Sequence, residues 1–136
     1  MSSAYLDKLR DEFIGSNFWR FLGIQVQTLE EGYAAIALPP SPNFLNVNDG
    51  IHGGVIVSLL DSAMGLTLRS TELSTAVTQS MTTQFLRGPK PGSTLYATGE
   101  IVRKGRRVIS MQGRVTDDDN QLIAIALATF ITRSER

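Results

Sequence analysis

Apolar residues recur at helical spacing in two parts of this chain. The first part lies near the start, with Ser2 or Ser3 as its N-cap candidate; its apolar residues are Tyr5, Leu6, Leu9 and Phe13, and an aromatic cluster of Phe18, Trp19, Phe21 and Leu22 follows. We expect a helix packed onto the rest of the protein. The alternative, a helix on a membrane surface, is disfavoured because its polar face mixes acids and bases. The second part predicts a longer helix over residues 54–70.

Strand-like segments flank the longer helix. Two short ones lie within residues 24–38, turn near residues 30–32, and end at the proline-rich residues 39–42. Four more follow the helix, over residues 76–86, 94–103, 107–116 and 121–132, and Gly, Pro, Asp and Asn are frequent in the connections. Consecutive strands joined by short turns predict an antiparallel sheet.

The last predicted strand separates small from large side chains. Its mostly small face consists of Leu122, Ala124, Ala126, Ala128 and Phe130, and its large face of Ile123, Ile125, Leu127 and Ile131. A face of small residues allows a helix to lie close against it, and the only long apolar helix is that of residues 54–70. The predicted fold class is therefore α+β: a curved antiparallel sheet wrapped around a central helix, known as the hotdog fold, with an extra N-terminal helix.

The composition fits one domain over residues 1–136, because a chain that is 42% hydrophobic can bury a substantial core. Thirteen basic and 13 acidic residues give a formal charge of zero, which argues against nucleic acid or an anionic membrane as a partner. The absence of cysteine excludes disulfides, thiolate metal sites and a cysteine nucleophile. No apolar run is long enough for a membrane span or a signal peptide, so we expect a cytoplasmic protein.

The candidate chemistry lies where a polar, glycine-rich loop opens onto the longer helix. The loop, residues 46–54, carries the only histidine, His52, and the helix that follows is interrupted by one carboxylate, Asp61. If the helix begins near Gly53, its first N–H groups lack intrahelical partners and lie at the positive end of the helix dipole. Such groups can stabilise a developing oxyanion, and glycine leaves room for a carbonyl to approach.

This motif resembles that of the hotdog-fold acyl-CoA thioesterases. Asn46 lies six positions before His52, His52-Gly53-Gly54 follows, and Asp61 lies nine positions after the histidine. The resemblance is closest to the phenylacetate-pathway (PaaI-like) branch, a relative of the 4-hydroxybenzoyl-CoA thioesterases, and it covers nearly the whole chain. It implies hydrolysis of an aryl- or medium-chain acyl-CoA to free acid and coenzyme A, no cofactor beyond the coenzyme A of the substrate, and a homodimer or homotetramer.

Helix geometry constrains how the motif could work. Asp61 lies eight residues beyond Gly53, about 12 Å along a helix axis at ~1.5 Å per residue. Reacting atoms must approach to about 3–3.5 Å. Either Asp61 is not involved, or it acts at an oxyanion site supplied by another subunit. A two-fold dimer with antiparallel central helices would bring Asp61 opposite Gly53 of the partner twice, and the resemblance implies this composite site.

The resemblance also implies roles for individual residues. The Gly53 N–H polarises the thioester carbonyl, Asn46 and His52 shape the loop and help position carbonyl or water, and Asp61 is general base or nucleophile. Counting back from residues 84–86 places Thr78 where the family often has a hydroxyl that assists the acid. Relatives commonly have glycine at the position of Asp49, whereas here the glycine comes one position later, at Gly50. The loop could therefore be shifted in register, which makes Asn48 an alternative to Asn46.

Each assignment has a structural alternative. His52 could be only a capping or loop residue, Asp61 could lie on an exposed polar stripe, and Gly53-Gly54 could merely form a turn. Gly54 and Asn48 are further substrate-binding candidates within the loop. Basic residues that could meet the phosphates of coenzyme A are Arg87, Lys104, Arg106 and Arg107, although exposed cations at turns are usually just solvated.

The sequence argues against a metal site but leaves two functional questions open. With one histidine and no cysteine, no metal site is expected. A non-catalytic acyl-CoA or lipid-binding protein of the same fold is the main alternative to an enzyme, ahead of a hydratase or dehydratase. Aromatic residues near Phe44 and Phe85 indicate an apolar chamber without distinguishing an aryl from an alkyl acyl group.

Overall fold

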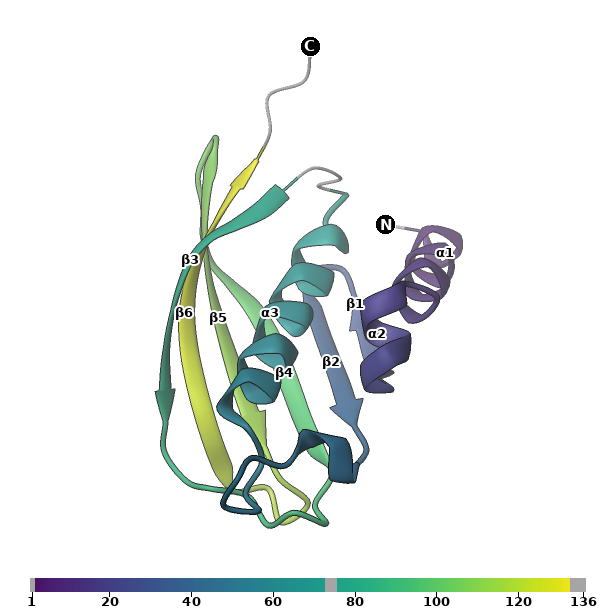
Figure 1. Ribbon diagram of the computed structural model, residues 1–136. Coiled ribbons are helices and arrows are strands. Elements are labelled where there is room, and N and C mark those ends of the chain that lie inside the picture. The colour runs from purple at the N-terminus through teal and green to yellow at the C-terminus, as the bar shows by residue number, and fades with distance from the viewer. Residues whose placement is uncertain (1, 73–75, 133–136) are drawn as a thin grey trace.

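The computed structural model describes residues 2–72 and 76–132. The elements along the chain are α1 (Ser3–Ile14), α2 (Asn17–Leu22), β1 (Gln25–Glu30), β2 (Tyr33–Leu38), η1 (Pro42–Phe44, a 3-10 turn), α3 (Gly53–Arg69), β3 (Ala76–Phe85), β4 (Leu95–Lys104), β5 (Val108–Thr116) and β6 (Leu122–Thr132). The strands form one antiparallel sheet in the order β1-β2-β4-β5-β6-β3. Figure 1 shows this sheet curving around α3, which confirms the predicted α+β hotdog architecture.

The central helix is held against the sheet by an apolar face and by two glycines. Its buried residues are Ile56, Leu59, Leu60, Ala63, Met64, Leu66, Thr67 and Leu68. Gly99 on β4 pairs directly with Gly113 on β5. A Cβ at Gly99 would lie 2.8 Å from the Ala63 carbonyl oxygen, and one at Gly113 would lie 3.1 Å from Leu60 Cδ2. The helix therefore lies closest to the sheet at these two positions.

The predicted close contact between the helix and the small face of the last strand is only partly found. Ala124, Ala126 and Ala128 are buried, and Ala126 pairs with Gly113 in the same row across the sheet. The closest approach nevertheless falls on β4 and β5, because glycine, with no Cβ at all, lets a helix backbone come nearer than alanine does.

The N-terminal region forms two helices where one was expected. Ser2 caps α1 by accepting a hydrogen bond from the Tyr5 N–H. The helix ends at Ile14 with Gly15 as its C-cap. The Ser16 hydroxyl donates to the Phe13 carbonyl at 2.6 Å, which satisfies an acceptor in the last turn of α1. The shorter α2 then buries Trp19 and Leu22. Figure 1 shows α1 and α2 beside β1 and α3, so the region packs onto the body as predicted.

Three polar or aromatic contacts hold α1 to the C-terminal end of α3. The Tyr5 hydroxyl donates to the Arg69 carbonyl at 2.8 Å. The Arg69 guanidinium pairs with Glu12 at 3.1 Å and lies over the Phe13 ring at 5.5 Å. Phe13 in turn meets Trp19 edge to face, with ring centroids 5.2 Å apart. Within residues 2–72 and 76–132, none of the helices has the length and apolar character needed to cross a membrane.

Candidate active site

The loop before α3 is folded by the Asn46 side chain. Its Oδ1 accepts hydrogen bonds from the N–H groups of Asn48, at 2.8 Å, and Gly50, at 3.1 Å. The Asn46 N–H donates to the Gly50 carbonyl at 2.7 Å, and Leu45 bridges to Ile51. Asn46 is therefore the residue that organises the loop, whereas Asn48 is exposed and contributes its backbone.

Asp49 adopts the backbone conformation that glycine favours. Its φ is +63°, in the left-handed region, and its N–H donates to the Asn46 carbonyl at 3.0 Å. Aspartate tolerates this region better than most residues because its side chain is short and polar. Asp49 thus occupies this position while Asn46 keeps its hydrogen bonds to Asn48 and Gly50.

The start of α3 leaves one backbone donor available. His52 is the N-cap, and its Nδ1 accepts a hydrogen bond from the Gly54 N–H at 2.9 Å. The Val55 N–H donates to the His52 carbonyl. Among the described residues, the Gly53 N–H makes no hydrogen bond. The structure therefore uses His52 and Gly54 for capping, and the Gly53 N–H is the group left for a ligand at the positive end of α3.

A cavity of about 370 Å³ lies in front of Gly53. It is lined by Ile51, Gly53, Ile56, Phe85, Leu86, Arg87, Gly88 and Pro89. The Phe85 ring is next to Gly53, since a Cβ added there would lie 3.4 Å from Phe85 Cζ. Arg87 is exposed, and its guanidinium donates to Gln121 at 2.6 Å.

Asp61 lies at a second cavity, of about 430 Å³, and is held by Thr78. The Thr78 hydroxyl donates to Asp61 Oδ1 at 2.6 Å. No hydrogen bond to Asp61 Oδ2 is made from the described residues. One carboxylate oxygen is therefore fixed while the other stays available to a substrate or a water molecule.

A bulge in β3 directs Thr78 toward Asp61. After the bulge, every second residue of β3 faces α3: Met81, Thr83 and Phe85. Without the bulge, this alternation would place Gln79, and not Thr78, on the side that faces α3. The pairing with β6 instead shifts between Thr78 and Ser80, and Thr78 pairs with the buried Phe130. An extra residue in one strand reverses the side on which the preceding residues lie. The local irregularity thus brings the hydroxyl to the carboxylate.

One chain does not bring the two halves of the site together. The cavities at Gly53 and Asp61 have no lining residue in common, and Gly53 and Asp61 are about 12 Å apart along the axis of α3. Among the basic residues, Arg87 lies at the end of the sheet where β6 begins, whereas the hairpin of Lys104, Arg106 and Arg107 lies where β6 ends. Figure 1 shows the hairpin and the loop before α3 at opposite ends of the molecule.

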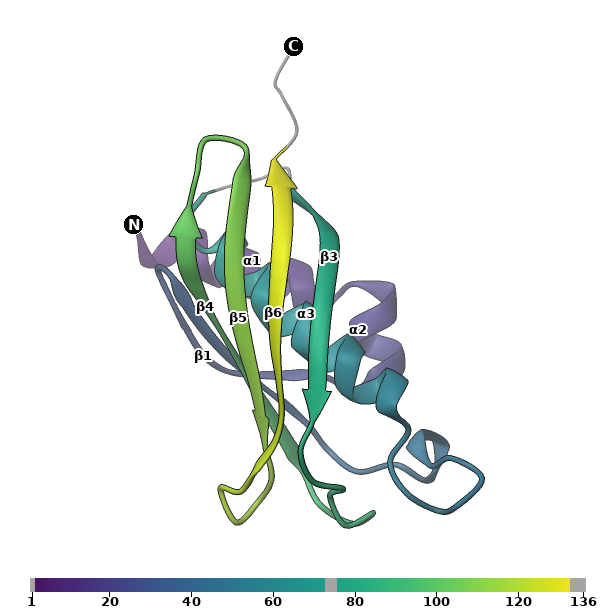
Figure 2. The same cartoon turned by 90° about the vertical axis from the view of Figure 1, so that its left-hand side faces the viewer.

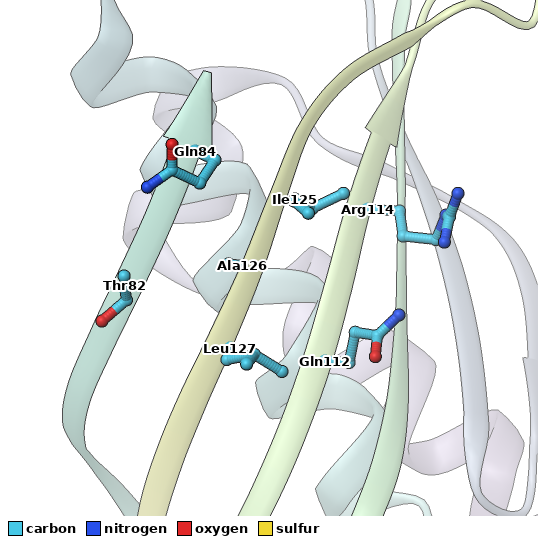
Figure 3. A pocket seen from close by; sticks show the side chains of 7 residues that line it. All are labelled: Thr82, Gln84, Gln112, Arg114, Ile125, Ala126 and Leu127. Carbon is cyan, nitrogen blue, oxygen red and sulfur yellow. The ribbon is translucent and has the colours of Figure 1, made fainter. Parts of the chain in front are cut away.

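The convex face of the sheet carries a separate groove of about 240 Å³. Figure 3 shows its side chains on β3, β5 and β6, with α3 behind the strands: Thr82, Gln84, Gln112, Arg114, Ile125, Ala126 and Leu127. None of the candidate catalytic residues lines this groove. The candidate residues Gly53, Asp61 and Thr78 line the other two cavities instead.

Most of the residues that line the Asp61 cavity were not among the predicted site residues. Its walls include the aromatic residues of α1 and α2 and the helix residues Ser62, Gly65, Leu68 and Arg69. For the aromatic cluster, the sequence predicts only packing onto the rest of the protein. Gly65, a glycine in the middle of an apolar helix and one turn beyond Asp61, was the signal that could have located this cavity.

The curved sheet around α3 is the fold of the hotdog thioesterases. The chain belongs to the Thioesterase superfamily, whose family model matches residues 49–124, and it is a thioester hydrolase. Within residues 2–72 and 76–132, no three or more His, Cys, Asp or Glu side chains are grouped so that they could hold a metal ion.

Similar proteins confirm the resemblance to the PaaI-like branch. The acyl-coenzyme A thioesterase PaaI of Escherichia coli K12 is 29% identical over 104 residues, which are 76% of this chain and 74% of that protein. The structure of the E. coli PaaI protein from the phenylacetic acid degradation operon has the same fold, with a TM-score of 0.87, 23% identity and 96% of each chain covered. A Streptococcus mutans protein, smu.793, solved with acetyl CoA bound, has a TM-score of 0.78 and 29% identity, covering 83% of this chain and 90% of that one.

Proposed function

We propose that the protein hydrolyses acyl-CoA thioesters to a free acid and coenzyme A, in active sites that two copies of the chain form together. The observation that carries this proposal is the division of the chemistry along α3, with the Gly53 N–H and the Asp61 carboxylate at separate cavities. Neither half is sufficient alone, because the carbonyl must meet the donor and the attacking group within about 3–3.5 Å.

The outer edge of β3 supports a two-fold arrangement. β3 is the last strand of the sheet (Figure 2), most of its residues are exposed, and within the described chain no strand pairs with its outer edge. Such an edge can add a second strand. Antiparallel pairing of two β3 strands would set the Phe85 end of one, at its Gly53 cavity, beside residues 76–78 of the other, at its Asp61 cavity.

In the proposed reaction, the thioester oxygen accepts a hydrogen bond from Gly53 of one chain, and Asp61 of the partner subunit starts the attack. As a general base, Asp61 takes a proton from the attacking water. As a nucleophile, its oxygen forms a mixed anhydride that water then hydrolyses. In both routes negative charge develops on the carbonyl oxygen, the C–S bond breaks, and coenzyme A leaves as a thiolate that takes up a proton.

The other candidates support this chemistry from outside the reacting atoms. Asn46 and His52 hold the loop that presents the Gly53 N–H, and Thr78 orients the carboxylate. Arg87 is the proposed partner for the phosphates of coenzyme A at the Gly53 cavity. The hairpin of Lys104, Arg106 and Arg107 contributes to the same coenzyme A only from the second copy, because it lies at the far end of its own chain.

An Asp61→Asn variant tests the proposal. Release of coenzyme A from benzoyl-, phenylacetyl- and medium-chain acyl-CoA should fall by about 10²–10⁴-fold, while calorimetric binding of the same thioesters is retained. Asp11→Asn, which removes an exposed carboxylate on α1, is the control. Unchanged release by Asp61→Asn contradicts the mechanism, and tight binding without release by the wild type indicates a non-catalytic acyl-CoA-binding protein.

The two possible roles of Asp61 can be distinguished because only the nucleophilic route forms an intermediate with the acyl group bound to the protein. Rapid quenching during a single turnover, followed by mass spectrometry, should show an acyl group on Asp61 if it is the nucleophile. The general-base route leaves the protein unmodified at every time point.

The composite site also requires self-association. A dimer is sufficient, and a tetramer of two such dimers keeps the same sites. Analytical ultracentrifugation distinguishes both from a monomer. A monomer that is active would contradict the proposal. The proposed location is the cytoplasm, which cell fractionation tests.

A further inference from the structure

The cavity at Asp61 extends along α3 toward its C-terminal end. Apolar walls come from Phe13, Phe18 and Trp19 on one side and from Leu68 and Phe130 on the others. Its volume of about 430 Å³ lies within the ~300–1,000 Å³ of small-molecule pockets. A mostly apolar space with a reacting carboxylate at one end suits an apolar group attached to the carbonyl under attack.

Gly65 keeps this space open, and the backbone gives no other reason for a glycine there. It lies four residues after Asp61, one turn further on the same face of α3. Its φ is not in the left-handed region, and a Cβ added to it would have no heavy atom within 4 Å. Gly99 and Gly113 differ, because a Cβ at either position would press on α3. A glycine in the middle of a helix lowers stability relative to alanine. At Gly65, this cost is offset by a functional gain, which is the cavity volume that a larger side chain would fill.

The charges on the wall favour an uncharged occupant. Arg69 lines the far end of the cavity, but its guanidinium is paired with Glu12 at 3.1 Å and stacked on Phe13 at 5.5 Å. The Asp61 carboxylate at the near end repels another anion. Arg69, Glu12 and Asp61 together carry one net negative charge, which disfavours an acyl group with a terminal carboxylate. Arg69 Nε is buried and has no hydrogen-bond partner among the described residues, so one donor at this end can meet an uncharged acceptor.

We propose that this cavity holds the acyl group, and that Gly65 and Phe18 determine how far an uncharged alkyl or aryl group can extend from Asp61 toward Arg69. The proposal rests on the thioesterase function proposed above and adds the part of the protein that selects the substrate. Asp61 and Arg69 are eight residues apart on α3, which is about 12 Å along the axis and suits a medium-length chain or a phenyl ring with a short linker.

Two substitutions change the cavity in opposite directions. Gly65→Leu fills it one turn beyond Asp61, and Phe18→Ala widens it at a side chain that is 52% exposed. Phe21→Ala is the matched control, because Phe21 lies on the same helix, is 80% exposed and does not line the cavity. All three are compared by kcat/KM for acetyl-, hexanoyl-, decanoyl-, dodecanoyl- and phenylacetyl-CoA.

The expected result is a change in length preference. Gly65→Leu should lower the decanoyl-to-acetyl ratio of kcat/KM by at least about tenfold, and Phe18→Ala should raise the dodecanoyl-to-hexanoyl ratio by about tenfold, since a single methylene in a pocket changes discrimination by about 10–200-fold. Phe21→Ala should keep the wild-type profile. Equal changes for all substrates overturn the proposal, as does loss of the dimer in Gly65→Leu, which would show that the glycine serves contact between copies.

Binding measurements separate this proposal from the proposed function. In the Asp61→Asn background, calorimetry should show the dissociation constant depending on acyl length, with the dependence altered by Phe18→Ala even if Gly65→Leu does not fold. If the wild type hydrolyses no acyl-CoA but this dependence holds, the catalytic proposal fails and the acyl pocket stands. If hydrolysis depends on Asp61 while Phe18→Ala leaves the length dependence of binding unchanged, only the acyl pocket fails.

Discussion

The two candidate groups on α3, the Gly53 N–H and the Asp61 carboxylate, are held in place by different kinds of contact. At Gly53, the hydrogen bonds that shape the loop and cap the helix join residues close in sequence, such as Asn46 with Gly50 and His52 with Gly54, and only the cavity wall comes from the distant end of β3. At Asp61, the contacts come from Thr78, 17 residues away, and from walls supplied by α1, α2 and β6. The donor half is thus a local backbone structure, whereas the acid half depends on packing between distant segments.

The largest effect on activity is expected when the Gly53 N–H, the donor of the local half, is removed. Gly53→Pro should lower kcat by about 10²–10³-fold, the usual cost of losing one oxyanion donor. Proline is accepted at the first helical position, and His52, with φ −62° and ψ 132°, already has the extended conformation that a residue before proline prefers. The fold should therefore persist, as measured by circular dichroism.

Gly53→Ala is the control for this variant. It keeps the N–H, and its Cβ would make an ordinary contact with Phe85 at 3.4 Å. An equally active Gly53→Pro protein would show that this N–H does not bind the oxyanion.

Mixing two inactive variants tests whether the halves come from different chains. A heterodimer of Gly53→Pro and Asp61→Asn has one site with both defects and one site with neither. After random exchange in an equal mixture, half of the dimers carry one intact site, so activity should recover to about a quarter of wild type. Activity assays after dissociation and reassociation measure this recovery, and none is expected if each chain holds a complete site.

A smaller loss should follow when the long-range support of Asp61 is removed. Thr78→Val keeps the shape of the side chain but deletes the 2.6 Å hydrogen bond to Oδ1. Hydrogen bonds to charged groups contribute about 1.5–3 kcal/mol, so kcat/KM should fall by roughly tenfold or more. Thr78→Ser, which restores the hydroxyl, should recover most of the rate; equal losses in both variants would indicate packing as the cause.

The smallest effect is expected in the loop. Asp49→Gly should change the free energy of unfolding by less than about 1 kcal/mol, because glycine relieves the left-handed φ of +63° but makes the unfolded chain more flexible. Asp49→Val should destabilise by more than about 1 kcal/mol, since a β-branched residue is strained at that φ. Urea unfolding distinguishes the two, and equal stabilities would show that the loop does not hold this conformation.

Local patterns predicted most of the element boundaries. The central helix was expected over residues 54–70 and spans Gly53–Arg69, and each of the four strands after it begins and ends within one residue of its predicted range. These elements follow from apolar periodicity and turn residues, which act over a few positions. The break between α1 and α2 at Gly15 and Ser16 was not predicted, because apolar and aromatic residues recur closely on both sides of it.

The sequence by itself determined the helix, the strands, the capped loop and the unpaired Gly53 N–H, because hydrogen bonds between near neighbours decide them. Only the tertiary structure decided three other features. A bulge at Gln79 directs Thr78 to Asp61, and α3 packs closest to the sheet at Gly99 and Gly113. Gly65 leaves open a cavity whose walls include α1 and α2. Those features depend on how segments far apart in the chain pack, and side-chain periodicity does not specify which segments meet.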